Sequence, residues 1–255
     1  MSDRIDSPVI EQQLRHRSVR KYLDEPVSDA QLEAIVAAAQ QASTSSNQQV
    51  WSVVAVRDAD RKRRISEAIG GRDYVERAPV FLVWIMDLAR NDALIRDQGV
   101  EPEALDLMEV TLMSALDTGI AAQSALLAAE SLGLGGVFVG SVRNDPEAVC
   151  AELGLPARAF PVVGMAIGVP DPEEGTGIKP RLPVSGVLHH EVYDPERWRE
   201  ATAVYERSYR DYFEGQGVPN RSWSRTVTGR LGPVTGLHGR HTMRESLRAQ
   251  GFESR

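Results

Sequence analysis

The chain has 255 residues, 42% hydrophobic and 25% charged, so it is long enough to bury a core without the disulfides or structural metals that small domains need. Its one cysteine, Cys150, excludes a disulfide framework and any metal site built from several cysteines, and it fits a reducing compartment. The net charge of −7 is the sum of +5 on residues 216–255 and −12 on residues 1–215. The acidity of residues 1–215 argues against nucleic-acid binding, because most of the surface would repel phosphate groups.

The N-terminal half predicts one helix and two strands. The first residues mix acids and bases and lack the basic-then-apolar order of an export signal, so we expect a cytoplasmic protein. Residues 28–42 place apolar side chains at helical spacing behind a serine that can cap a helix. Residues 50–57 and 79–86, like 160–169 further on, are short apolar or β-branched runs that predict strands covered on both faces.

Residues 103–132 predict a long helix that is apolar nearly all round, followed by glycines and a strand at 137–140. Such a helix must be buried on all sides. It is either the central helix of the domain or it packs on its twin in a dimer, and the sequence leaves both open. Polar side chains within the stretch argue against a membrane span. They are Asp106, Glu109, Asp117, Gln123 and Glu130.

The C-terminal part begins with a loop rich in proline and glycine, residues 170–186, and continues with an amphipathic helix at 194–214. The last 40 residues have few apolar side chains and predict an extended excursion. The positive charge of residues 216–255 could bind a small phosphorylated ligand or contact a partner subunit. The alternative is that this segment is a solvated charged end of the chain. Helices and strands alternate as in α/β or α+β proteins, with no repeat and no linker long enough to separate two domains.

Three polar clusters are candidates for chemistry, and each is a weak signal alone. HRSVR at 16–20 offers two guanidinium groups, a hydroxyl and backbone N–H donors, which together can grip a phosphate. Residues 179–181 (KPR) add two cations, and residues 43–49 add hydroxyls and amides that are also typical of a polar turn. Phosphate-loop, dinucleotide and hydrolase motifs are missing. The adjacent His189 and His190 have no partner at ligand spacing, so we expect no metal site.

Together these segments resemble the nitroreductase and flavin reductase family, and in particular its larger, oxygen-insensitive, NADPH-preferring branch. The match runs through RHRSVRKYLDEPVSDAQLEAIVAAAQQAST, SSNQQVWS, LDTGIAAQSALLAAESLGLGGVFVG and IKPRLP, and so covers most of residues 11–185. The resemblance implies an α+β fold, a central mixed sheet surrounded by helices, and a homodimer with residues 103–132 as its long buried interface helix. It makes residues 1–190 the flavin-binding core. Residues 191–255 become a helical or extended excursion of the same domain that packs on the core or on the partner subunit.

The resemblance further implies FMN, bound without a covalent link. Arg17 would reach its phosphate, and Arg20 would lie beside N1 and O2, where a fixed guanidinium stabilises the negative charge of the reduced ring. The implied cofactor-binding residues are His16, Arg17, Ser18, Arg20, Thr44, Ser45, Ser46, Arg72, Phe138, Val139, Gly140, Ser141, Lys179 and Arg181. The implied nucleotide or substrate residues are Ser46, Glu109, Arg221 and Arg240.

Some positions depart from the pattern of that branch. Arg72 stands where a glutamine is usual, Ser141 replaces a glycine and Thr44 a serine. Gln216 stands where an arginine usually holds the 2′-phosphate of NADPH, a contact worth about 1.5–3 kcal/mol. We still expect NADPH as the hydride donor, because Arg221 and Arg240 match neighbouring arginines of the family and Arg225 or Arg230 can substitute for the missing one.

The activity implied is ping-pong transfer of two electrons from NAD(P)H, through FMN, to nitroaromatics, quinones, free flavin or chromate, with no covalent catalysis by a side chain. One alternative is a flavin reductase that supplies reduced FMN to a partner enzyme. Another is a flavin carrier without turnover, which the Gln216 substitution favours. A third is an unrelated phosphate-ligand binder, which would carry no flavin colour. We expect only small-molecule partners besides the second subunit, with no nucleic acid and no membrane.

Overall fold

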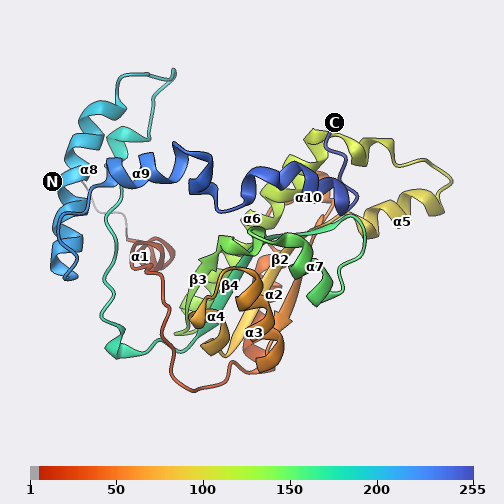
Figure 1. Ribbon diagram of the computed structural model, residues 1–255, viewed down its shortest axis with the longest axis horizontal. Helices are drawn as coiled ribbons and strands as arrows, with labels where there is room; N and C mark the ends of the chain where they lie inside the picture. The colour runs from red at the N-terminus through yellow and green to blue at the C-terminus, as the bar shows by residue number, and fades with distance from the viewer. Residues whose placement is uncertain (1–5) are drawn as a thin grey trace. The chain divides into compact units, whose positions relative to one another are not determined.

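The computed structural model describes residues 6–255, so the first five residues of the charged start lie outside it. The chain forms two compact units, Met1–Gly175 with Gly239–Arg255, and Thr176–His238. The first unit contains four strands: β1 (Trp51–Val56), β2 (Val80–Asp87), β3 (Gly135–Val139) and β4 (Ala159–Gly168) (Figure 1). The α-helices described in this unit are α1 (Pro8–Leu14), α2 (Asp29–Gln40), α3 (Ala59–Ala68), α4 (Asp73–Arg77), α5 (Ala89–Asp97), α6 (Met108–Ser131), α7 (Pro146–Leu153) and α10 (Met243–Ala249). The second unit contains α8 (Trp198–Gly215) and α9 (Trp223–Leu231).

The four strands form one sheet in the order β1-β2-β4-β3, and every neighbouring pair is antiparallel. All four predicted strands and the α+β class are confirmed. The expected mixed pairing is wrong for these strands, because within residues 6–255 the parallel pairing is an isolated bridge between Ser18 and Gly136. A β-bulge interrupts β4, where Trp84 pairs with Val163 but Ile85 pairs with Pro161.

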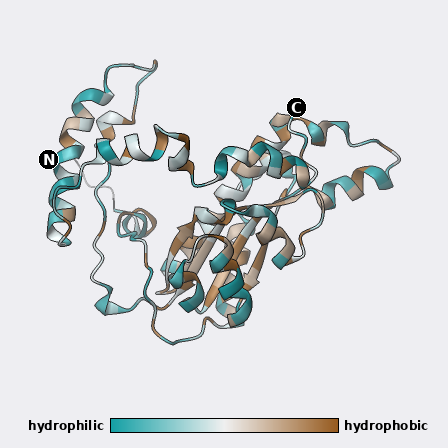
Figure 2. Ribbon diagram, in the orientation of Figure 1, coloured by the Kyte–Doolittle hydropathy of each residue, from teal (hydrophilic) through white to brown (hydrophobic). Residues whose placement is uncertain are grey.

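Helices cover both faces of the sheet, which explains the continuous apolar runs of β2 and β4 without parallel pairing. On one face Leu82 and Trp84 pack among side chains of α2 and α6. On the other face Phe81 and Val83 pack among side chains of α3, α4 and α7. Figure 2 shows the strands largely brown, with hydrophilic residues gathered on the surrounding helices.

The predicted helix at 28–42 is α2. The Ser28 hydroxyl accepts a hydrogen bond from the Gln31 backbone N–H, and the Gln31 side chain accepts one from the Ser28 N–H. This capping box starts the helix where the sequence predicts, and Ile35 and Ala39 turn its apolar side into the core.

The predicted helix at 103–132 is a short 3-10 helix, Glu103–Asp106, followed by α6. Its small side chains from Ala121 to Ala129 pack against α2 and the sheet. The opposite side is not buried in the single chain, contrary to expectation. Four side chains at intervals of one helical turn are 43–57% exposed, and we name them the α6 stripe: Met108, Leu112, Leu116 and Ile120. By length and composition α6 would also pass as a candidate membrane span.

The end of the chain is not an extended excursion but part of the first unit. Phe252 is fully buried, in an edge-on contact with Phe160 at 6.3 Å between ring centroids. The backbone of Arg255 bonds Asp106 and Met108 at 2.9 Å each, so the last residue pairs with the start of α6. The low apolar content of the last 40 residues led us to expect an extended segment, which is wrong for α10 and the residues after it. A few apolar side chains there suffice to hold this part of the chain against the first unit.

The second unit follows the prediction more closely. The segment from 170 to 186 contains only two short 3-10 helices, and the helix expected at 194–214 is α8. Within this unit Tyr205 of α8 meets Trp223 of α9 edge-on, with ring centroids 5.1 Å apart.

Candidate functional site

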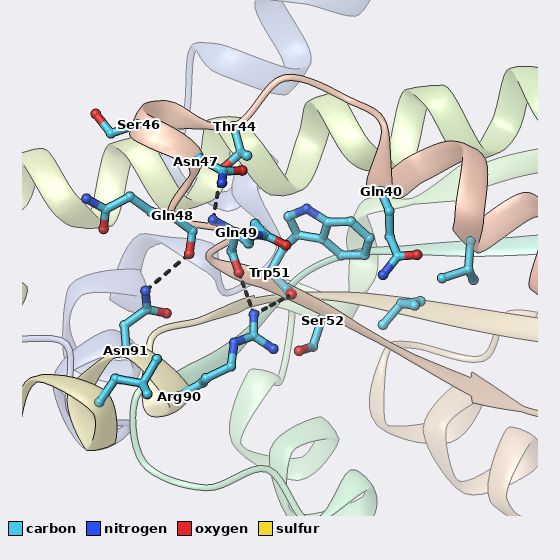
Figure 3. Close-up of a pocket in the computed structure, with 13 residues that line it drawn as sticks. Gln40, Thr44, Ser46, Asn47, Gln48, Gln49, Trp51, Ser52, Arg90 and Asn91 are labelled. Atoms are coloured by element: carbon cyan, nitrogen blue, oxygen red, sulfur yellow. Dashed lines mark hydrogen bonds between the residues drawn. The ribbon is translucent and has the colours of Figure 1, made fainter. Parts of the chain in front are cut away.

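A polar pocket of about 790 Å³ opens between the end of α2, the segment Thr44–Gln49, the edge strand β1 and α5 (Figure 3). It contains two predicted site residues, Thr44 and Ser46. Its lining residues are Val36, Gln40, Thr44, Ser46, Asn47, Gln48, Gln49, Trp51, Ser52, Val53, Arg90, Asn91 and Leu94. The wall offers amides, hydroxyls and one guanidinium beside the Trp51 indole, which suits hydrogen-bonded contact with a polar partner.

The wall segment Thr44–Gln49 has a strained backbone. Ser46, Asn47 and Gln49 adopt left-handed conformations, with φ of 47°, 57° and 52°. A side chain in this region costs about 1 kcal/mol or more, so the conformation persists only where the surroundings impose it, as functional segments commonly require.

Two helices impose that conformation. The carboxylate of Asp117, buried on α6, accepts hydrogen bonds from the Thr44 hydroxyl at 2.6 Å and from the Ser45 backbone N–H at 3.0 Å. From α5, the Asn91 amide donates to the Gln48 carbonyl at 3.2 Å and Arg90 donates to the Gln49 carbonyl at 2.5 Å (Figure 3). The segment is therefore fixed at both ends.

The HRSVR segment runs beside β3, where the Val19 N–H donates to the Gly136 carbonyl at 3.0 Å. His16 Nδ1 lies 2.5 Å from a carboxylate oxygen of Glu130 on α6. The Arg20 guanidinium lies 5.9 Å from the centre of the Tyr74 ring, a cation–π distance. His16 and Arg20 are thus both in contact with side chains from other parts of the first unit.

Sequence reasoning missed Glu174, whose nearly buried carboxylate bridges two predicted flavin residues. One oxygen lies 3.1 Å from Arg17 Nη1, and the other accepts a hydrogen bond from the Arg20 backbone N–H at 2.7 Å. A guanidinium has several N–H donors in a planar fork, so a carboxylate on one nitrogen orients Arg17 and still allows a phosphate to bind. No local pattern signals Glu174, because it lies 154 residues from Arg20.

The turn at Gly140, where β3 ends, is cationic. A Cβ added at Gly140 would lie 3.5 Å from Arg143 Nη2 and 3.6 Å from Arg240 Nη1, ordinary contact distances. Packing of the protein on itself therefore does not require glycine at this position, whereas close approach of a ring system to the backbone would. Cationic side chains and an uncrowded backbone fit the negatively polarised edge of a flavin.

The predicted residues fall into groups. Residues 16–20 lie along β3, and the end of the same strand carries Phe138, Val139, Gly140 and the buried Ser141, with Arg240 beside them. Thr44 and Ser45 are hydrogen-bonded to Asp117 of α6 instead, and Ser46 follows them in the same segment.

The remaining predicted residues are more scattered. The Arg72 N–H donates to Ser66 Oγ at 2.8 Å at the start of α4, and Glu109 is exposed on the first turn of α6. Lys179, Arg181 and Arg221 belong to the second unit. There Arg181 donates to the Lys179 carbonyl at 2.9 Å, and Arg221 lies over the Phe213 ring at 5.5 Å.

Comparison with known proteins gives concordant matches. The nitroreductase family model matches residues 14–98 and 70–169, and the model of the C-terminal domain of the nitroreductase family matches 179–255. A Bacillus subtilis protein named FMN reductase NAD(P)H is 36% identical over 249 residues, 96% of this chain and 98% of its own. The oxygen-insensitive NADPH nitroreductase of Salmonella typhimurium is 38% identical over 220 residues, 86% of this chain and 88% of its own. The solved structure of B. megaterium NfrA2 matches with a TM-score of 0.91 at 33% identity, covering 98% of this chain and 100% of that one.

Proposed function

Because the chain belongs to the nitroreductase family and is an NAD(P)H-dependent FMN oxidoreductase, we propose that it reduces nitroaromatics, quinones or related electron-poor small molecules. FMN is its cofactor and NADPH a hydride donor. When bound, FMN supplies the redox chemistry, taking a hydride from the nicotinamide and passing two electrons to the acceptor. The protein's part is to bind, orient and tune it.

The observation that carries this proposal is the alignment of cations along one strand. Arg17 and Arg20 lie beside the start of β3, and Arg240 lies at its end by Gly140. In the proposed site Arg17 binds the flavin phosphate, and Arg20 faces N1 and O2, where its fixed charge favours the reduced ring. Glu174 orients the Arg17 guanidinium and fixes the backbone of Arg20, which lowers the entropy lost when the cofactor binds.

A second candidate function is reduction of free flavin for use by another enzyme. The name of the Bacillus relative, an FMN reductase, favours it. The same cleft would serve both activities, because in each the acceptor approaches the same face of the bound cofactor.

We also propose a cytoplasmic homodimer. The α6 stripe leaves apolar side chains in water at intervals of one helical turn, the pattern of a helix that packs on a second helix. A dimer with the Thr44–Gln49 segment near its interface would complete a flavin site from both subunits. The single cysteine, buried and with its pKa raised to about 12 by desolvation, suits a reducing compartment.

The test is an anaerobic titration of the purified protein with NADPH and, separately, NADH, followed by the visible flavin spectrum. We expect flavin absorption that bleaches at lower NADPH than NADH concentration, because Arg225 or Arg230 can substitute for the arginine missing at Gln216. Equal bleaching by both nucleotides would make this a dual-nucleotide enzyme. Bound flavin that neither nucleotide reduces would instead support the carrier, and no flavin binding would contradict the proposal.

A further inference from the structure

In the second unit, α8 holds a segment that forms neither helix nor strand, residues 177–183. The Tyr212 hydroxyl donates to the Gly177 carbonyl at 3.1 Å, and the Tyr205 hydroxyl donates to the Pro180 carbonyl at 3.2 Å. The two tyrosines are two helical turns apart and so project from the same side of α8. The segment is therefore fastened to the helix at two points.

Close packing against α8 supports the same arrangement. A Cβ added at Gly177 would lie 3.4 Å from Cε2 of Tyr212, and one added at Gly186 would lie 2.5 Å from the Cβ of Ala201. Ala201 and Tyr205 are buried and lie one helical turn apart. No side chain fits at Gly186 without a shift, so the chain after the segment is seated on α8 as well.

The fastened segment carries two cations, Lys179 and Arg181, which are exposed on either side of the half-buried Pro180. The proline ring fixes the backbone torsion φ between them. Arg181 Nη1 donates to the Lys179 carbonyl at 2.9 Å and to the Pro180 carbonyl at 3.2 Å. A guanidinium has five N–H donors, so an anion can still bind Arg181 through its other nitrogens.

The hydrogen bonds fix the directions in which these cations leave the backbone. The carbonyls of Gly177, Lys179 and Pro180 all accept hydrogen bonds, and each orients a planar peptide group. Burial raises the pKa of Tyr205, and the nearby charge of Arg181 opposes that rise. The Tyr205 hydroxyl is therefore protonated and able to donate at neutral pH.

We propose that Tyr205 and Tyr212 are positioning residues, which hold Lys179 and Arg181 in the arrangement that binds the phosphate of FMN. This inference rests on the proposed function, in which FMN is the cofactor. A guanidinium and an ammonium group both pair well with phosphate oxygens. Two cations on a fixed backbone lose less conformational entropy on binding than two on a free loop. The tyrosines act through the segment and do not contact the cofactor.

The test compares FMN with riboflavin, which has the same ring and ribityl chain but no phosphate. Each is titrated into the full-length protein after its flavin has been removed, and the dissociation constant is read from the change in flavin fluorescence. Tyr205→Phe and Tyr212→Phe each remove one hydroxyl and keep the ring. Each should weaken FMN binding about three- to tenfold and change riboflavin binding less than about twofold.

A double-mutant cycle shows whether the tyrosine acts through the cations. Lys179→Gln combined with Arg181→Gln should weaken FMN binding about tenfold or more and affect riboflavin little. In that background Tyr205→Phe should change FMN binding less than about twofold, because the segment it holds no longer carries the charges.

Tyr209→Phe is the matched control. Tyr209 lies on α8 between the other two tyrosines, but its hydroxyl is 3.3 Å from Thr226 Oγ1 of α9. Its loss should change neither dissociation constant. If Tyr205→Phe fails to fold, Tyr212→Phe tests the same role, because Tyr212 is half-buried and not fully buried.

Equal weakening of FMN and riboflavin binding would assign the tyrosines to the stability of the fold and overturn the proposal. Unchanged FMN binding in both tyrosine variants would overturn it too, as would an undiminished effect of Tyr205→Phe in the protein that lacks the two cations. A wild type that binds neither FMN nor riboflavin would instead contradict the proposed function itself.

Discussion

Buried carboxylates position several side chains of the proposed flavin site. Glu174 holds Arg17 and the backbone of Arg20, and Asp117 holds Thr44 and Ser45. Each carboxylate replaces lost water contacts with two hydrogen bonds, so it is satisfied in the core and restricts its partners to one geometry. Groups that touch a cofactor are commonly oriented by such neighbours, whose loss weakens the site without removing any direct contact.

Arg20→Ala should leave FMN bound and slow turnover by an order of magnitude or more, because the reduced ring loses a fixed positive charge beside N1 and O2. Stopped-flow reduction by NADPH together with the flavin midpoint potential checks this. The potential should become more negative. Ser43→Ala, which changes an exposed hydroxyl of the same protein, serves as the control and should be close to wild type. Equal, near-wild-type rates in both variants would remove Arg20 from the proposed role.

Asp117→Ala should destabilise the protein by about 1–3 kcal/mol, since it leaves the Thr44 hydroxyl and the Ser45 N–H without their acceptor. It should also weaken FMN binding, because the left-handed residues that follow lose one of their two anchors. Urea unfolding and flavin fluorescence titration measure the two effects. Ser131→Ala, at the exposed last residue of α6, is the matched control. Unchanged FMN affinity in Asp117→Ala would separate this segment from the flavin site.

At the scale of elements, local sequence patterns predicted the helices and strands that depend on residues close together in the chain. Ser28 and Gln31 mark the start of α2 within four residues, and each strand of the sheet is visible as an apolar or β-branched run. Such patterns could not predict whether neighbouring strands are parallel or antiparallel, because an apolar run indicates that a strand is buried and not how the next strand is oriented. Glu174 was missed for the same reason: its partners lie far away in sequence.

The packing of the last residues against the first unit was also not predicted from the sequence, and its contribution to stability can be measured. Phe252→Ala should cost about 3–5 kcal/mol, because Phe252 is fully buried against Phe160 and a cavity would remain. Glu253→Ala, next to it and exposed, should stay within about 0.5 kcal/mol of wild type. Chemical denaturation gives both values. A loss below about 1 kcal/mol for Phe252→Ala would mean that the end of the chain is not held by this side chain.

The ion pairs of Asp106 should make this docking dependent on pH. Hydrogen bonds from Arg158 and then Arg255 hold the pKa of Asp106 below its ordinary value of 3.8, although desolvation opposes them. A lowered folded-state pKa contributes stability above the unfolded-state value, and that contribution is lost as the pH falls through the folded-state value. The Tm of wild type should therefore exceed that of Asp106→Asn at neutral pH, and the difference should shrink below about pH 4. A difference that stays constant down to pH 2 would contradict this role.

At the scale of the whole molecule, the question is what covers the α6 stripe. Leu116→Glu should convert the proposed dimer to monomers, because a charge at a helix–helix contact is desolvated without a partner. Val100→Glu alters a side chain that is equally exposed, 56% against 57%, but lies outside the stripe, and it should leave the dimer intact. Sedimentation velocity distinguishes the two states. Identical sedimentation of wild type and Leu116→Glu would remove the stripe from the interface.

The sequence left a central helix and a dimer helix as alternatives, and the exposed side of α6 now favours the second.

The division of the chain has a consequence for synthesis on the ribosome. The first unit is closed by its last residues, since Phe252 joins a cluster with Val50 and Met86, and Arg255 pairs with the start of α6. Everything from Thr176 to His238 is translated between those two parts. At about 5–20 residues per second, the emerging sheet and α6 wait several seconds with that cluster incomplete. During that interval the cluster around Val50 and Met86 lacks the Phe252 side chain, so apolar surface that is buried in the folded first unit stays exposed to water until Phe252 docks.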